Sequence, residues 1–92
     1  MEFKDKRVII TAGAGGIGRE ITRLFVEAGA KVFICDIDET ALENTLSSFD
    51  NVSGVRVDIS DPDQFKSFFN KADEYLGGLD IMINNAGTAG PT

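Results

Sequence analysis

At 92 residues the chain has the length of one small domain, residues 1–92, and its 42% hydrophobic and 26% charged side chains are ordinary for a folded protein. Its net charge of −6 argues against a general affinity for nucleic acid or anionic membranes. The first residues lack the apolar core of a signal peptide, the apolar runs are too short to span a membrane, and one cysteine cannot form an internal disulfide, so we expect a cytoplasmic protein.

The first third of the chain has the pattern of a strand, a glycine-rich turn, a helix and a second strand. Arg7 to Thr11 is predicted to be a strand of a parallel sheet, because its apolar residues are consecutive rather than alternating. Apolar residues then recur at helical spacing as far as Gly29, a typical glycine at a helix end. Lys31 to Cys35 is predicted to be the second strand, which ends in Asp36, with Cys35 as a buried structural thiol.

The rest of the chain repeats the alternation of helix and strand. A second helix is predicted to begin after its cap, Asp38, and a third after Asp61, where Asp61-Pro62-Asp63-Gln64 has the pattern of a helix start. Val55 to Asp58 is predicted to be the third strand, and Leu79 to Asn84 the fourth.

This order predicts an α/β fold, a Rossmann-type doubly wound parallel sheet with strand order 3-2-1-4, truncated after its fourth strand. The first two helices are expected on one face of the sheet and the third on the other. The fourth strand then has an open apolar edge, so we expect the chain to self-associate or to be marginally stable.

The turn from Thr11 to Gly18 fits two glycine patterns. Gly13, Gly15 and Gly18 match GxGxxG, and the same segment matches TGxxxGxG with Ala12 at its first glycine. Both patterns let a bare backbone approach a pyrophosphate at the positive end of a helix. The alanine methyl group can be accommodated if that residue keeps a negative φ, and we expect cofactor binding to survive this change.

Asp36 lies 18 residues after Gly18, close to the spacing of the acidic residue that binds the adenosine ribose in dinucleotide sites. Its carboxylate would repel a 2′-phosphate, and the next residue, Ile37, offers no positive charge to neutralise one. Arg19 falls in the first helical turn and is expected to be solvated. The sequence therefore predicts NAD rather than NADP.

With that loop and with Asn84-Asn85-Ala86-Gly87, essentially the whole chain resembles the short-chain dehydrogenase/reductase family. The resemblance implies that the glycine loop touches the pyrophosphate, that the end of the second strand binds the adenosine ribose, that the end of the third contacts adenine, and that the Asn84 segment forms a wall beside the cofactor. The implied NAD-binding residues are Gly13, Gly15, Gly16, Ile17, Gly18, Asp36, Ile37, Asp58, Ile59, Asn85, Ala86 and Gly87. Two alternatives stay open: Asn84 can brace the sheet instead, and Asp58 can be a turn residue.

Members of that family are longer and carry a catalytic serine and a Tyr-x-x-x-Lys pair. Here the one tyrosine, Tyr75, is followed four residues later by Leu79 and is expected to pack, so no catalytic residue is assigned. We expect the N-terminal, NAD-binding part of an oxidoreductase acting on a small alcohol or carbonyl compound, inactive by itself. The alternatives are a non-catalytic NAD-binding module or subunit completed by a partner chain, and an S-adenosylmethionine methyltransferase, which the Asn84 segment disfavours.

Overall fold

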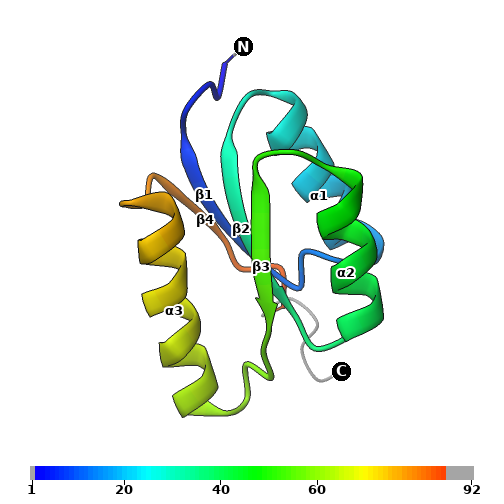
Figure 1. Ribbon diagram of the computed structural model, residues 1–92, viewed down its shortest axis with the longest axis vertical. Helices are drawn as coiled ribbons and strands as arrows, with labels where there is room; N and C mark the ends of the chain where they lie inside the picture. The colour runs from blue at the N-terminus through cyan, green and yellow to red at the C-terminus, as the bar shows by residue number, and fades with distance from the viewer. Residues whose placement is uncertain (1, 87–92) are drawn as a thin grey trace.

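The computed structural model describes residues 2–86, so the predicted site residue Gly87 lies outside the described residues. A four-stranded sheet in the order β3-β2-β1-β4 stands between the helices (Figure 1). All three strand pairs are parallel. The strands are β1 (Arg7–Thr11), β2 (Lys31–Asp36), β3 (Val52–Arg56) and β4 (Ile81–Ile83), and the helices are α1 (Gly16–Glu27), α2 (Glu39–Ser48) and α3 (Pro62–Leu76). The predicted fold class and strand order are confirmed.

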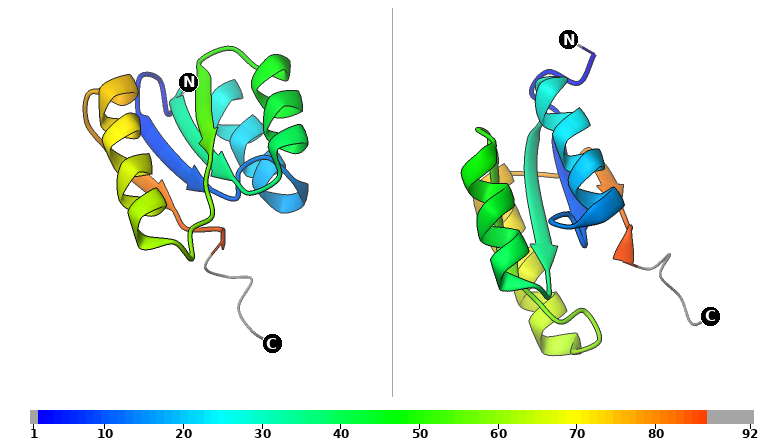
Figure 2. Two further views of the ribbon diagram at one scale, coloured as in Figure 1. Left: turned by 60° about the horizontal axis from the view of Figure 1, so that its bottom comes forward. Right: turned by 90° about the vertical axis from the view of Figure 1, so that its right-hand side faces the viewer.

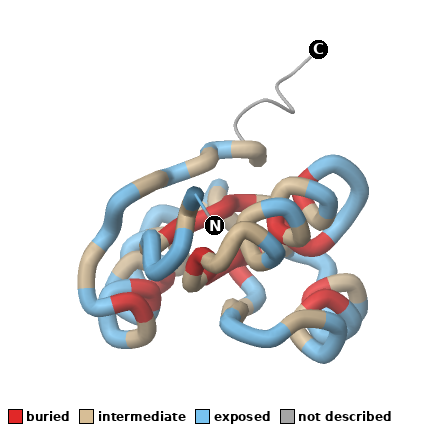
Figure 3. The backbone as a smooth tube through the Cα atoms, turned by 90° about the horizontal axis from the view of Figure 1, so that it is seen from above, coloured by how far each residue is buried: buried red, intermediate tan, exposed pale blue. Residues whose placement is uncertain are grey.

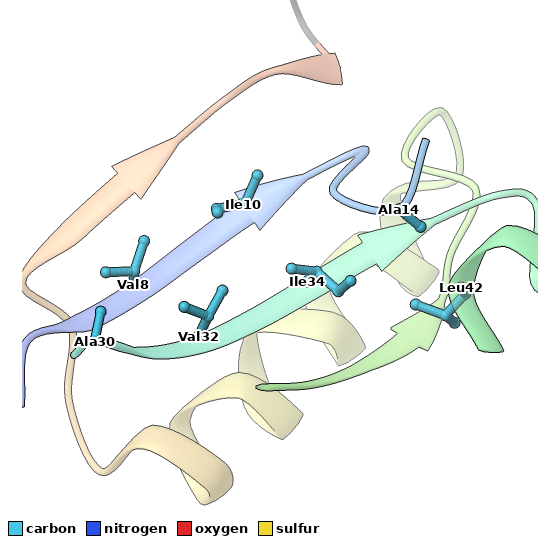
Figure 4. Close-up of a cluster of buried hydrophobic side chains, with 7 residues drawn as sticks. All are labelled: Val8, Ile10, Ala14, Ala30, Val32, Ile34 and Leu42. Atoms are coloured by element: carbon cyan, nitrogen blue, oxygen red, sulfur yellow. The ribbon is translucent and has the colours of Figure 1, made fainter. Parts of the chain in front are cut away.

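The helices divide between the two faces of the sheet as predicted. Helices α1 and α2 lie on one side and α3 lies on the other (Figure 2, left). One buried cluster therefore packs under α1 and α2. Figure 4 shows its side chains on β1 and β2, in the segments that adjoin these strands and on α2: Val8, Ile10, Ala14, Ala30, Val32, Ile34 and Leu42. A second cluster lies under α3 and contains Ile9, Phe33, Cys35, Val57, Phe68, Ala72 and Leu76.

Burial is concentrated in the two central strands (Figure 3). Strands β1 and β2 are buried along almost their whole length, whereas β3 and β4 are only partly buried because they form the two edges. No helix in residues 2–86 is long and apolar enough to cross a membrane.

The predicted boundaries of two strands are wrong. Strand β3 begins at Val52, three residues before the predicted Val55, and ends at Arg56, two residues before the predicted Asp58. The reason is pairing with β2, which places Val52 opposite Val32 and overrides the weak strand preference of the intervening Ser53 and Gly54. Strand β4 is limited to three residues, shorter than the predicted Leu79 to Asn84.

The edge strand β4 is fixed to β1 by a contact that the sequence pattern does not reveal. The Arg7 guanidinium donates to both carboxylate oxygens of Asp80, at 3.0 and 3.2 Å, and the Arg7 backbone N–H donates to the same carboxylate at 2.9 Å. These hydrogen bonds lower the pKa of Asp80 to about 2. Asp80 lies just before β4 and Arg7 is the first residue of β1, so the pair fastens the start of β4 beside the start of β1.

Candidate functional site

The predicted site residues that the structure describes gather at the carboxyl ends of the strands. An open hollow of about 240 Å³ lies there, between the ends of β1, β2 and β3. It is lined by Ala12, Cys35, Asp36, Ile37, Val57, Asp58, Ile59 and Ala86. In open parallel sheets, ligands bind at this end, where the chain connections diverge to the two faces.

The four loop glycines have two different roles. A Cβ at Gly13 would lie 2.7 Å from the Ile34 side chain, and a Cβ at Gly18 would overlap the carbonyl oxygen of Ala12, so these two glycines permit close packing within the fold. A Cβ at Gly15 or Gly16 would meet nothing within 4 Å, and Gly16 has a φ of +50°. Gly15 and Gly16 therefore present bare backbone to open space, as an approaching phosphate requires.

The N-terminus of α1 lacks the side-chain cap that the other described helices have. Asp38 accepts a hydrogen bond from the first turn of α2, and Asp61 accepts two from the first turn of α3. At α1 the cap is Gly15, which has no side chain to offer. The N–H groups of the first turn of α1 are thus left to pair with water or with an anion.

Ala12 adopts a backbone conformation opposite to the expected one. Its φ is +53°, in the left-handed region, whereas we expected a negative φ. For an L-residue this region costs about 1–2 kcal/mol. The surrounding hydrogen bonds hold it there: the Asn85 amide donates to the Ala12 carbonyl at 3.2 Å, and the Gly13 N–H donates to the Cys35 carbonyl at 3.0 Å.

The Asp36 carboxylate stands at the end of β2 and is already oriented by backbone groups. One oxygen accepts from the Ala14 N–H at 3.1 Å, and the other accepts from the Asp38 N–H at 3.0 Å. The neighbouring Ile37 is 56% exposed beside the hollow. Each carboxylate oxygen can accept more than one hydrogen bond, so ribose hydroxyls can still pair with Asp36.

One cation on the strand beside Asp36, Arg56, is not predicted by the sequence pattern. Arg56 lies directly opposite Asp36 in the β2–β3 pairing, and its Nε donates to the Ile37 carbonyl at 3.1 Å. The misplaced third strand put Arg56 in mid-strand instead of at the strand end. Only the register of β3 against β2 places Arg56 opposite Asp36.

Arg19 is not freely solvated as expected, because side chains of α2 hold it. Its guanidinium donates to the Thr45 hydroxyl at 2.9 Å and to the Ser48 hydroxyl at 3.1 Å, and it lies 5.4 Å from the centre of the Phe49 ring.

Asp58 takes the turn role that the sequence left open, and its place at the hollow leaves the adenine contact a prediction. Its carboxylate accepts from the Ser60 hydroxyl at 2.6 Å and from the Ser60 N–H at 3.0 Å, which makes it a turn residue. These hydrogen bonds lower the pKa of Asp58, and the bond from the Ser60 hydroxyl has the larger effect. Asp58 also lines the hollow with Ile59.

The segment after β4 is fastened to the end of β1. The Thr11 hydroxyl donates to the Asn84 side-chain oxygen at 3.0 Å and accepts from the Ala86 N–H at 3.0 Å. With the Asn85 contact to the Ala12 carbonyl, these bonds hold the segment against the glycine loop. Asn84 thus fills the bracing role, and Asn85 braces the loop as well.

Neither Cys35 nor Tyr75 has the setting of a reactive group. Cys35 is fully buried, as predicted, and burial raises the pKa of its thiol to about 11. The Tyr75 ring packs 5.7 Å from that of Phe33 and under the Lys31 ammonium at 4.5 Å, and burial raises its pKa. Within residues 2–86 no group of three metal-ligating side chains comes together.

Known proteins share this arrangement. A family model described as short chain dehydrogenase matches residues 6–92. The short chain dehydrogenase/reductase dpchG of Colletotrichum higginsianum is 41% identical over 85 residues, covering 88% of this chain and 32% of that protein.

Among the solved structures that match, two have TM-scores of 0.82. One is a variant of the actinorhodin polyketide ketoreductase with NADPH, 28% identical, covering 88% of this chain and 33% of that one. The other is the 3-ketoacyl-(acyl-carrier-protein) reductase from Brucella melitensis with NADH, 29% identical, covering 86% and 33%. The chain spans about a third of the length of these relatives.

Proposed function

The chain belongs to the short-chain dehydrogenase family, and on that premise we propose that it is the NAD-binding part of an oxidoreductase. The reaction would transfer a hydride between NAD(H) and a small alcohol or carbonyl substrate. The observation that carries the proposal is the uncapped N-terminus of α1 together with the Asp36 carboxylate, which accepts from the N–H of Ala14 just before that N-terminus. A pyrophosphate needs the first feature and an adenosine ribose uses the second.

The residues of the hollow and of the adjoining glycine loop fit such a cofactor. Gly15 and Gly16 leave room for the pyrophosphate beside the first turn of α1, and the apolar side chains of Ile37 and Ile59 border a space for the adenine ring. Asp36 would accept hydrogen bonds from the ribose hydroxyls. The bound nicotinamide would supply the hydride acceptor or donor, while these residues bind and orient the nucleotide.

Selection of NAD over NADP is proposed on the charge of Asp36. Relatives in this family include structures with NADH and with NADPH, so membership alone does not decide the cofactor. A 2′-phosphate would lie beside a carboxylate whose position two backbone N–H groups fix. Arg56 brings one positive charge to the adjacent strand end, but it donates to the Ile37 carbonyl rather than to Asp36.

Asp36→Ala tests the proposed ribose contact. Hydrogen bonds to a charged group contribute about 1.5–3 kcal/mol, so the variant should bind NADH about tenfold to a hundredfold more weakly. Asp50→Ala, which removes an exposed carboxylate outside the hollow, is the matched control and should bind like the wild type. Equal NADH affinity in both variants, measured by fluorescence titration, would refute the assignment.

We further propose that these 92 residues do not catalyse the reaction alone. The family resemblance assigns the serine and the Tyr-x-x-x-Lys pair to a second half, and this chain spans about a third of its relatives. The alternative is an NAD-binding module or subunit completed by a partner chain. Both predict NADH binding without turnover, and they differ in whether a separate chain restores turnover.

Self-association is proposed through the open sheet. Strand β4 is an edge strand, and large apolar side chains on and beside it and on α1 are exposed, namely Leu79, Met82, Ile17 and Leu24. An apolar strand with an unpaired edge favours pairing with a second chain. Light scattering should show a dimer or larger species, and a monomer at tens of micromolar concentration would contradict the proposal.

A further inference from the structure

Thr45 is a buried polar side chain that contacts the glycine loop from outside the hollow. It lies in α2 and is 0% exposed. Its hydroxyl donates a hydrogen bond to the Ala14 carbonyl at 3.0 Å and accepts one from Arg19 at 2.9 Å. Threonine inside a helix often donates to a carbonyl of its own helix, whereas this hydroxyl crosses to another element.

Arg19 determines which way that hydroxyl points. A guanidinium can only donate, so the Thr45 oxygen must accept from it, and the single hydroxyl proton is left for the Ala14 carbonyl. Arg19 is itself held by the Ser48 hydroxyl and by the Phe49 ring. The direction of the bond to Ala14 is therefore fixed by Arg19 of α1, which Ser48 and Phe49 hold in place.

Ala14 is thus held on both sides. Its N–H donates to Asp36 and its carbonyl accepts from Thr45. All described peptide bonds are trans, so the Gly15 N–H points opposite to the Ala14 carbonyl and away from α2. The backbone that faces open space at Gly15 and Gly16 begins at this fixed peptide.

We propose that Thr45, oriented by Arg19, is a positioning residue for the pyrophosphate-binding loop. It fixes the Ala14 carbonyl so that the backbone of Gly15 and Gly16 is ready for the diphosphate before it arrives. The inference rests on the proposed function, because only a nucleotide-binding protein would bind a diphosphate at this loop. Loss of the hydroxyl should weaken binding of a diphosphate more than binding of a nucleoside.

The test compares ADP with adenosine, which differ only in the diphosphate. In Thr45→Val the affinity for ADP should fall about threefold to tenfold, because one buried hydrogen bond is lost and its partners are left unpaired, while the affinity for adenosine stays within twofold. Thr45→Ser keeps the hydroxyl and should restore ADP binding. Thr40→Val makes the same change at an exposed position of α2 and should match the wild type.

Amide chemical shifts from NMR titrations, well below the melting temperature, give both affinities and show whether each variant is folded. If Thr45→Val is unfolded, Arg19→Lys takes its place. This substitution keeps the positive charge but loses the planar guanidinium, and it should lower the affinity for ADP, but not for adenosine, by about twofold to threefold. Equal losses for ADP and adenosine, or none for ADP, would overturn the positioning role. A wild-type chain that binds neither ADP nor NADH would instead refute the proposed function.

Discussion

The left-handed backbone at Ala12 predicts that Ala12→Gly makes the protein more stable. The φ of +53° costs alanine about 1–2 kcal/mol, and glycine removes that cost. Glycine in turn loses about 0.4–1 kcal/mol through the greater freedom of the unfolded chain. The net expectation is a gain of about 0.5–1 kcal/mol, which raises the melting temperature of a domain of this size by about 2–8 °C.

Thermal unfolding followed by circular dichroism measures this change. Ala28→Gly is the matched control, since Ala28 is also partly buried but has a φ of −82°, where alanine is unstrained. Ala28→Gly should lower the melting temperature, whereas Ala12→Gly should raise it. A lower melting temperature in both variants would refute the argument that strain is stored at Ala12.

Two further predictions concern charged groups. The pKa of Asp80 is lowered from 3.8 to about 2, so its contact with Arg7 stabilises the folded state fully above pH 4, and this stabilisation is lost as the pH falls toward 2. In Asp80→Asn the free energy of unfolding should therefore fall less steeply between pH 4 and pH 2 than in the wild type. An unchanged pH dependence would contradict the role of this pair. Arg56→Ala should lower the affinity for NADPH by a few-fold and leave that for NADH unchanged, because only a 2′-phosphate would use its charge; parallel fluorescence titrations compare the two, and an equal loss for both nucleotides would contradict that reading.

Short stretches of the sequence were enough to predict the elements whose own residues determine their conformation. The consecutive apolar residues of β1 and β2 predict a buried parallel pair, and the capping pattern at Asp61 and Gln64 predicts the start of α3 within a residue. Strand β3 could not be placed in this way. A glycine such as Gly54 is typical of a turn. In the structure, however, a Cβ added at Gly54 would lie 2.5 Å from the carbonyl oxygen of Ile34, so the close approach of β2 explains the glycine.

The errors at the site have the same origin in contacts between distant residues. Arg56 could be placed beside Asp36 only with the register of β3 in hand. The orientation of Arg19 depends on side chains of α2 that lie 26 and 29 residues further along the chain. The positive φ of Ala12 follows from the bond that Asn85 makes to its carbonyl, across 73 residues. None of these contacts has a local pattern.

Titration calorimetry of the wild-type chain with NADH and NADPH tests the proposed binding site and its selection of NAD most directly. The uncapped start of α1 should receive the pyrophosphate of either nucleotide, and the carboxylate of Asp36 should accept the free ribose hydroxyls of one and repel the 2′-phosphate of the other. NADH should bind at least tenfold more tightly than NADPH at moderate salt. NADPH binding as tight as that of NADH would contradict it.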